Sequence, residues 1–137
     1  MKKLIPFAIL SLLIFAASCG LKEQKKITTD QSTQFEDSIP HIIPSARSIH
    51  TMQNDDITKV TIVVGDPSFY TSDPAAKQQA AIRVGLMVLH VLGPDNNLNT
   101  GTFAVTKKDD NNDKLPADAI TADMKIDSLK KILFPAK

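Results

Sequence analysis

The side chains best suited to binding a metal ion lie in the acidic run 109–113. The run follows the pattern D-x-N-x-D with which many calcium-binding loops begin, because Ca²⁺ prefers a cluster of oxygen ligands. Such loops need glycine at the sixth position and a bidentate glutamate at the twelfth, where this chain has Lys114 and Ile120. Because Asp and Asn are also ordinary turn residues, we expect a solvated hairpin loop, with a calcium site as the alternative.

Residues that could support catalysis are few and scattered. His41, His50 and His90 show no metal-ligand spacing such as H-E-x-x-H, and Ser68 lies in D-P-S-F rather than in a nucleophile elbow. The sequence places no histidine and carboxylate pair beside that serine. We therefore expect no catalytic residue, no metal site and no cofactor.

Two aromatic residues, Phe69 and Tyr70, lie in segment 65–73, between the end of a predicted strand and the start of a predicted helix. This is a favoured ligand position in α/β proteins, but the charge of Asp73 and the missing N–H of Pro74 disfavour an anion there. Aromatic side chains in a loop can anchor a binding partner, or they can fold back over the end of the core. Phe69 and Tyr70 are the candidate interaction loop, and both alternatives stay open.

The start of the chain has the features of a secretory signal. Lys2 and Lys3 precede an apolar run, 4–17, which at about 14 residues is shorter than the roughly 20 that a membrane-spanning helix needs. Small residues follow, and then Cys19, the only cysteine in the chain. We expect residues 1–18 to be a cleaved signal peptide. With no second cysteine, the mature domain has no intramolecular disulfide.

The pair Ala17-Ser18 directly before Cys19 resembles the lipobox of bacterial lipoproteins, although Ala16 stands where that motif usually has Leu. The resemblance covers the first 20 residues. It implies cleavage before Cys19, acyl chains such as palmitate on that residue, and a periplasmic, membrane-anchored place in the cell envelope. Several chains give durable attachment, because each buried methylene contributes about 0.8 kcal/mol. Gly20, where inner-membrane lipoproteins carry Asp, implies the outer membrane rather than the inner one.

The charge balance argues against nucleic acid as a partner. Without Lys2 and Lys3, the 16 basic residues become 14, against 15 acidic ones, so that the mature chain has a net charge of −1. The sequence has no basic stripe and no long block of like charge that could hold a phosphate backbone.

Segment 20–37 is polar, with Ile27 and Phe35 as its main apolar anchors, and two prolines follow it. Such a segment buries too little apolar surface to offset its ordering entropy, and proline disfavours regular structure. We therefore expect residues 19–46 to be a lipid anchor and a disordered tether, whose flexible part would span roughly 25 to 30 Å. Residues 47–137 remain as a single domain.

The clearest predicted element is a helix over 75–92. Asp73 suits the N-cap, Pro74 suits the first helical position, and a Gly-Pro pair ends the pattern. The segment is apolar on most sides, so the helix must be buried along much of its girth. Ala81 and Gly85, one turn apart, provide a strip of small residues that a strand could approach closely.

Runs of β-branched residues predict strands at 57–64 and 102–106, with 48–52 as a hairpin partner of the first. Strict alternation over 120–127 predicts a half-exposed strand, followed by a terminal helix over 129–134. The residues of this last strand expected to face inward are Ile120, Ala122, Met124 and Ile126.

The order β-α-β-β-α, with an extra strand in front where 48–52 pairs, predicts a small two-layer α+β domain with helices on one face of a short mixed sheet. We favour a non-enzymatic interaction module, tethered by lipid on Cys19, that binds an envelope protein through a sheet edge or the aromatic loop. The alternatives are a small-ligand or calcium-binding lipoprotein and, less favoured, an envelope hydrolase. Catalytic spacing is absent and the domain is small, which favours the first function.

Overall fold

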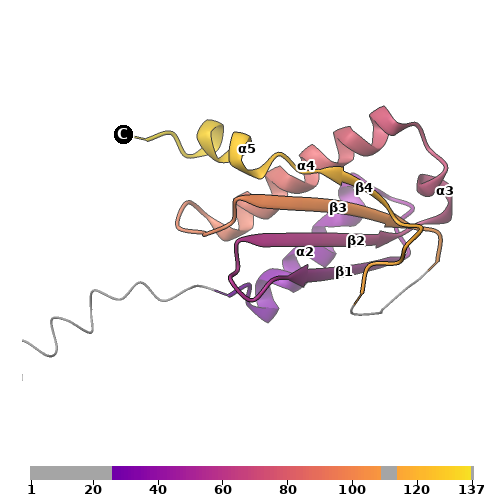
Figure 1. Cartoon of the computed structure of the whole chain (residues 1–137), viewed down its shortest axis with the longest axis horizontal. Coiled ribbons are helices and arrows are strands. Elements are labelled where there is room, and N and C mark those ends of the chain that lie inside the picture. The colour runs from indigo at the N-terminus through magenta and orange to yellow at the C-terminus, as the bar shows by residue number, and fades with distance from the viewer. Residues whose placement is uncertain (1–25, 109–113, 137) are drawn as a thin grey trace, which may run out of the picture.

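The computed structural model describes residues 26–108 and 114–136. Their elements are, in chain order, α2 (Thr29–Ile42), β1 (Ser48–Gln53), β2 (Lys59–Gly65), α3 (Pro67–Tyr70), α4 (Pro74–Leu92), β3 (Thr100–Thr106), β4 (Ile120–Asp123) and α5 (Ile126–Leu133). The strands form one sheet in the order β1-β2-β3-β4, with α2 and α4 behind it (Figure 1). β2 and β3 are parallel, and each pairs with an antiparallel edge strand. The predicted α+β class is confirmed, whereas the predictions for 1–18, Cys19 and 109–113 lie outside the described residues.

One face of the sheet packs against α2 and α4. Successive strand residues point to opposite faces, so alternate residues of the central strands enter the core. The core residues of β2, β3, α2 and α4 include Val60, Ile62, Val64, Phe103, Val105, Phe35, Ile39, Val84 and Val88. The other face, which includes His50, Thr61 and Thr102, has none of the described helices in front of it (Figure 1). The result is two layers, as predicted.

The extra N-terminal strand forms, and β1 pairs with β2 along its whole length. Asn54 closes the turn between them, because its Oδ1 accepts hydrogen bonds from the N–H groups of Thr58 and Lys59 at 3.0 and 2.9 Å. Ile57 has a left-handed backbone with φ of 57°. This conformation is incompatible with an extended strand, so β2 begins at Lys59 rather than at the predicted residue 57.

α4 begins and ends where the sequence predicts. Asp73 is its N-cap, Pro74 lies in its first turn, and Gly93 is its C-cap with φ of 78°. The close approach expected at Gly85 is present, because a Cβ atom on residue 85 would lie 2.7 Å from the carbonyl oxygen of Met124. Only glycine allows the chain after β4 to cross the helix at this distance.

The prediction of a disordered tether through residue 46 is wrong for residues 29–42, which form α2. Thr28 and Gln31 make a capping box: the Thr28 Oγ1 accepts from the Gln31 N–H at 3.2 Å, and the Gln31 Oε1 accepts from the Thr28 N–H at 2.9 Å. Phe35 and Ile39, four residues apart on one helical face, are fully buried against the sheet and α4. Their burial outweighs the cost of Pro40 in the last turn.

The predicted strand over 120–127 is too long, because β4 ends at Asp123 and α5 begins at Ile126. Lys125 lies between them in a left-handed conformation with φ of 58°, which turns the chain. Met124 and Ile126 are buried as expected, since they fill the space beside Gly101, where a Cβ atom would lie 2.9 Å from the Met124 sulfur. Ile120 pairs with the core residue Val105 and so lies on the inward face as predicted, but it is 37 % exposed because it lies on the edge strand.

Candidate functional site

The carboxyl ends of the two parallel strands are joined through Asp66, which directly follows β2. Its N–H donates to the carbonyl oxygen of Thr106, the last residue of β3, at 3.0 Å. Its side chain is the N-cap of α3: Oδ1 accepts from the N–H of Ser68 and of Phe69, both at 3.0 Å, and from the Ser68 hydroxyl at 2.8 Å. Oδ2 accepts from the hydroxyl of Ser45. The Asp66 carboxylate therefore accepts four hydrogen bonds.

Asp66 is only 1 % exposed, so its ionisation depends on these contacts. Burial by itself raises the pKa of Asp66, because it penalises the charged form. The hydrogen bonds from Ser45, Phe69 and Ser68 outweigh that effect and place the pKa below its ordinary value. A carboxylate held ionised in this way is suited to fixing the strand ends rather than to exchanging protons with a substrate.

The predicted interaction loop is the short helix α3, and both of its aromatic residues are half-buried. Phe69 folds back onto the core, where its ring meets Phe103 edge to face with centroids 6.3 Å apart. The Tyr70 hydroxyl donates to the Asp118 carbonyl at 2.7 Å, and the Lys107 ammonium lies 5.1 Å from the centre of the tyrosine ring. These contacts attach the chain before β4 to the end of the core. The role of Phe69 and Tyr70 as partner anchors stays a prediction.

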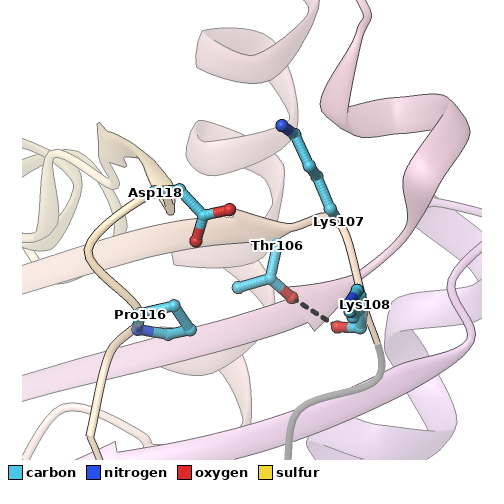
Figure 2. A pocket seen from close by; sticks show the side chains of 5 residues that line it. All are labelled: Thr106, Lys107, Lys108, Pro116 and Asp118. Carbon is cyan, nitrogen blue, oxygen red and sulfur yellow. Dashed lines mark hydrogen bonds between the residues drawn. The ribbon is translucent and has the colours of Figure 1, made fainter.

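Beside this helix lies a hollow of about 170 Å³, lined by Thr106, Lys107, Lys108, Pro116 and Asp118 (Figure 2). The Thr106 side chain is buried and its hydroxyl donates to the Lys108 carbonyl at 2.9 Å. Among the described residues, its lining includes two lysines and one aspartate but no histidine or cysteine. Such a set can hold a small anionic group, but it offers no pair of a nucleophile and a base.

A second hollow, of about 250 Å³, lies between the start of α2 and β1. We call it the β1 pocket, and its lining residues are Ile27, Thr28, Thr29, Ser32, Thr51 and Gln53. The Gln53 Oε1 accepts from the Ile27 N–H at 3.3 Å, and the buried Thr51 hydroxyl oxygen has no hydrogen-bond partner within the described part of the chain. Sequence reasoning missed this pocket because it treated α2 as tether, although the T-x-x-Q capping pattern at Thr28 could have revealed the helix.

β1 is one edge of the sheet, and alternate residues present their backbone to that edge. The Asn54 N–H donates to the Lys59 carbonyl at 3.3 Å, so Asn54 and Lys59 form a hydrogen-bonded pair. In an antiparallel ladder every second residue bonds to the neighbouring strand, so the backbone groups of Met52 and His50 bond to β2. The residues whose N–H and C=O groups point away from β2 are Ile49, Thr51 and Gln53. None of these groups has a backbone partner among residues 26–108 and 114–136.

The other candidate residues do not assemble into a site. His41 lies on α2, His50 on β1 and His90 on α4, and no three potential metal ligands cluster among the described residues. The Ser68 hydroxyl donates a hydrogen bond to Asp66 Oδ1. Within the same part of the chain, no helix is both long and apolar enough to cross a membrane.

The described residues thus form a charged hollow at the carboxyl ends of the parallel strands, a polar pocket beside the start of α2 and an open strand edge at β1. Comparison with known proteins adds nothing to assign them: no family model matches this chain, and neither a curated protein nor a solved structure shows significant similarity to it.

Proposed function

We propose that the chain is a membrane-anchored, non-enzymatic interaction module of the cell envelope, which binds an extended segment of a partner protein as an added strand beside β1. The observation that carries this proposal is the row of outward backbone groups at Ile49, Thr51 and Gln53. Backbone groups at a sheet edge supply affinity for an extended peptide, while pockets for alternate side chains supply specificity.

The two edges of the sheet differ in the features that normally prevent strand addition. β1 has six residues and contains neither a charged residue nor a proline. β4 has four residues and ends at Asp123, whose carboxylate pairs with the Lys125 ammonium at 3.4 Å. Short length and charge protect an edge, so β4 is protected and β1 is open. This difference supports β1 as the binding edge.

The predicted lipid on Cys19 would keep this edge close to a membrane. The hydrogen bond from Ile27 to Gln53 places the start of the described chain beside the end of β1. The residues from Cys19 to Ile27 can span at most about 28 Å, because an extended chain advances about 3.5 Å per residue. We therefore infer a partner near the bilayer surface. Gly20 favours the outer membrane by the lipoprotein resemblance.

Photo-crosslinking in intact cells tests this function. A photoreactive amino acid replaces Gln53 on β1 or, as the matched control, the exposed Arg83 on α4. We expect one discrete adduct from position 53 and none from position 83. The adduct should weaken in Cys19→Ser, which should also move the protein from the membrane fraction to the soluble fraction.

Thr51→Pro tests whether the adduct requires strand pairing with β1 or only a partner that lies near residue 53. Proline removes the outward N–H of residue 51 but leaves the ladder to β2 intact, so the variant should fold. The adduct from position 53 should then disappear. An adduct that persists in Thr51→Pro, or that forms equally from position 83, would contradict binding along β1.

A further inference from the structure

We propose that the last turn of α5 docks on the bilayer to which the chain is anchored, so that the side chains of Ile132 and Leu133 enter the lipid. This inference rests on the proposed membrane anchor. It adds a second membrane contact, which decides how the domain stands on the bilayer.

The end of α5 exposes consecutive apolar side chains. Ile126 and Leu129, earlier in the helix, are buried in the core. Ile132 is 73 % exposed and Leu133 is 40 % exposed, so Ile132 is the most exposed large apolar side chain among residues 26–108 and 114–136. Phe134, which follows, is half-buried against the core. Single exposed apolar residues are ordinary, whereas neighbouring ones indicate a contact surface. We call residues 132–134 the C-terminal patch.

The C-terminal patch and the start of the described chain lie at the same end of the molecule (Figure 1). The Lys130 ammonium donates to two carbonyls of the loop before β3. In that loop the Asn99 N–H donates to the Thr58 carbonyl at 2.9 Å, which connects it to the turn between β1 and β2. The end of β1 in turn contacts the start of α2 through the hydrogen bond from Ile27 to Gln53. These contacts cross one end of the domain from α5 to the anchored segment.

The position of the anchor favours a bilayer as the occupant of the C-terminal patch. A lipid on Cys19 would hold Ile27 within about 28 Å of the membrane, because an extended chain advances about 3.5 Å per residue. The tether makes docking an intramolecular step, so a contact too weak to hold a free protein is sufficient. Burial of most of one isoleucine side chain favours the docked arrangement by roughly 10-fold.

The charges at this end make apolar burial the main attraction. The Lys131 side chain is 76 % exposed, so its methylene stem can lie on the C-terminal patch while its ammonium reaches lipid phosphates. Its contact with Asp127 at 3.4 Å is an exposed ion pair of small energetic value. Asp55 and Asp56, both exposed in the turn between β1 and β2, offset the lysine charge. We therefore expect docking on a bilayer that carries no net charge.

Docking by this end orients the open edge of the sheet. The strands run from this end of the molecule toward the opposite one, and β1 ends here at Gln53 (Figure 1). The strands therefore stand away from the bilayer, with Gln53 nearer to the lipid than Ser48. The edge of β1 stays free for the proposed partner.

Tryptophan fluorescence measures the docking directly, because the chain contains no tryptophan. The protein is purified from cell membranes as Ile132→Trp or, as the matched control, as Arg83→Trp, at an exposed position in the middle of α4. Each is reconstituted into phosphatidylcholine vesicles with or without brominated acyl chains. We expect emission at shorter wavelength and strong quenching by brominated lipid from position 132, and neither effect from position 83.

A second substitution tests whether apolar burial drives the contact. Leu133→Asp, combined with Ile132→Trp, places a carboxylate in the C-terminal patch, where burial in lipid is costly. Quenching of the tryptophan at position 132 should then fall several-fold, while the protein still floats with the vesicles through its lipid. Thermal melting confirms that this variant folds.

Each other outcome overturns a defined part of the proposal. Equal emission and quenching at positions 132 and 83 would refute docking and leave the lipid anchor standing. Emission at shorter wavelength from position 132 without quenching by brominated lipid would show that protein covers the patch, which also refutes docking. Failure of the protein to float with vesicles would refute the anchor, on which this inference and the proposed function both rest. The crosslink from position 53 tests strand pairing independently.

Discussion

Replacing Gly85 with alanine should destabilise the domain, although alanine is the better helix former. Gly85 lies in the middle of α4, where the chain leaving β4 crosses the helix. A Cβ atom there would lie 2.7 Å from the Met124 carbonyl oxygen and 3.1 Å from the Leu129 Cδ1. The nearest atom belongs to the backbone, so a rotamer change cannot relieve the clash.

The magnitude follows from two opposing contributions. Alanine gains about 1 kcal/mol over glycine in a helix interior. Overpacking a filled core costs about 1 to 3 kcal/mol, and the upper half of this range applies because Met124 is held by its N–H bond to the Gly101 carbonyl at 2.9 Å. The net loss should be about 1 to 2 kcal/mol, which lowers Tm by about 5 to 10 °C in a domain of this size.

Urea and thermal unfolding, followed by circular dichroism, measure the net effect. Arg83→Ala and Arg83→Gly are the matched controls, because they compare the same two residues at an exposed position of α4. Arg83→Ala should be more stable than Arg83→Gly by about 1 kcal/mol. If Gly85→Ala were stabilised by a similar amount, the close crossing of α4 by the chain after β4 would be refuted.

Three further substitutions test the end of the parallel strands and the C-terminal turn. The pKa of Asp66 in the folded protein lies below its ordinary value of 3.8, so the ionised carboxylate stabilises the fold above that pH, and this stability is lost as the pH falls through the folded pKa. The urea midpoints of wild type and Asp66→Asn should therefore converge on acidification. A difference between the two midpoints that stays constant with pH would contradict the lowered pKa. Lys125→Gly should gain up to about 1 kcal/mol in thermal unfolding, because glycine adopts the left-handed φ of 58° without strain, whereas Lys125→Ala should gain nothing. Lys130→Met should lower the free energy of unfolding in urea by about 1 to 3 kcal/mol, because the Lys130 ammonium donates to two carbonyls of the loop before β3 at 3.0 and 2.9 Å. The control is Lys131→Met, at a side chain that is 76 % exposed, which should change this free energy by less than about 0.5 kcal/mol.

Elements with strong local signals were predictable. α4 carries a capping residue, a proline in its first turn and a glycine stop, which act within a few residues of the helix ends. The β-branched run of β2 and the small residue at Gly85 likewise identified a buried strand and a close crossing. Such signals depend on the backbone preferences of single residues, so they survive without knowledge of the fold.

α2 and the turn at Lys125 required contacts that are distant in sequence. A 14-residue polar segment is marginal as an isolated helix, and α2 is stable because Phe35 and Ile39 meet the sheet and α4. The alternation of apolar and polar residues over 120–127 fits one continuous strand as well as it fits a strand followed by a turn. The turn forms because Met124 and Ile126 fill the space beside Gly101.

The candidate sites divide in the same way. From the sequence, Phe69 and Tyr70 are a predicted interaction loop, and the start of the chain with its single cysteine resembles a lipoprotein signal. The sequence also predicted the α+β class and shows no catalytic spacing, because residue type and local order carry these properties. Only the tertiary structure brought Ser45 to the Asp66 carboxylate, turned Phe69 onto Phe103 and set the start of α2 beside β1. The β1 pocket and the open edge arise from the pairing of segments far apart in the chain, and such pairing is decided by the burial of the whole core rather than by any local pattern.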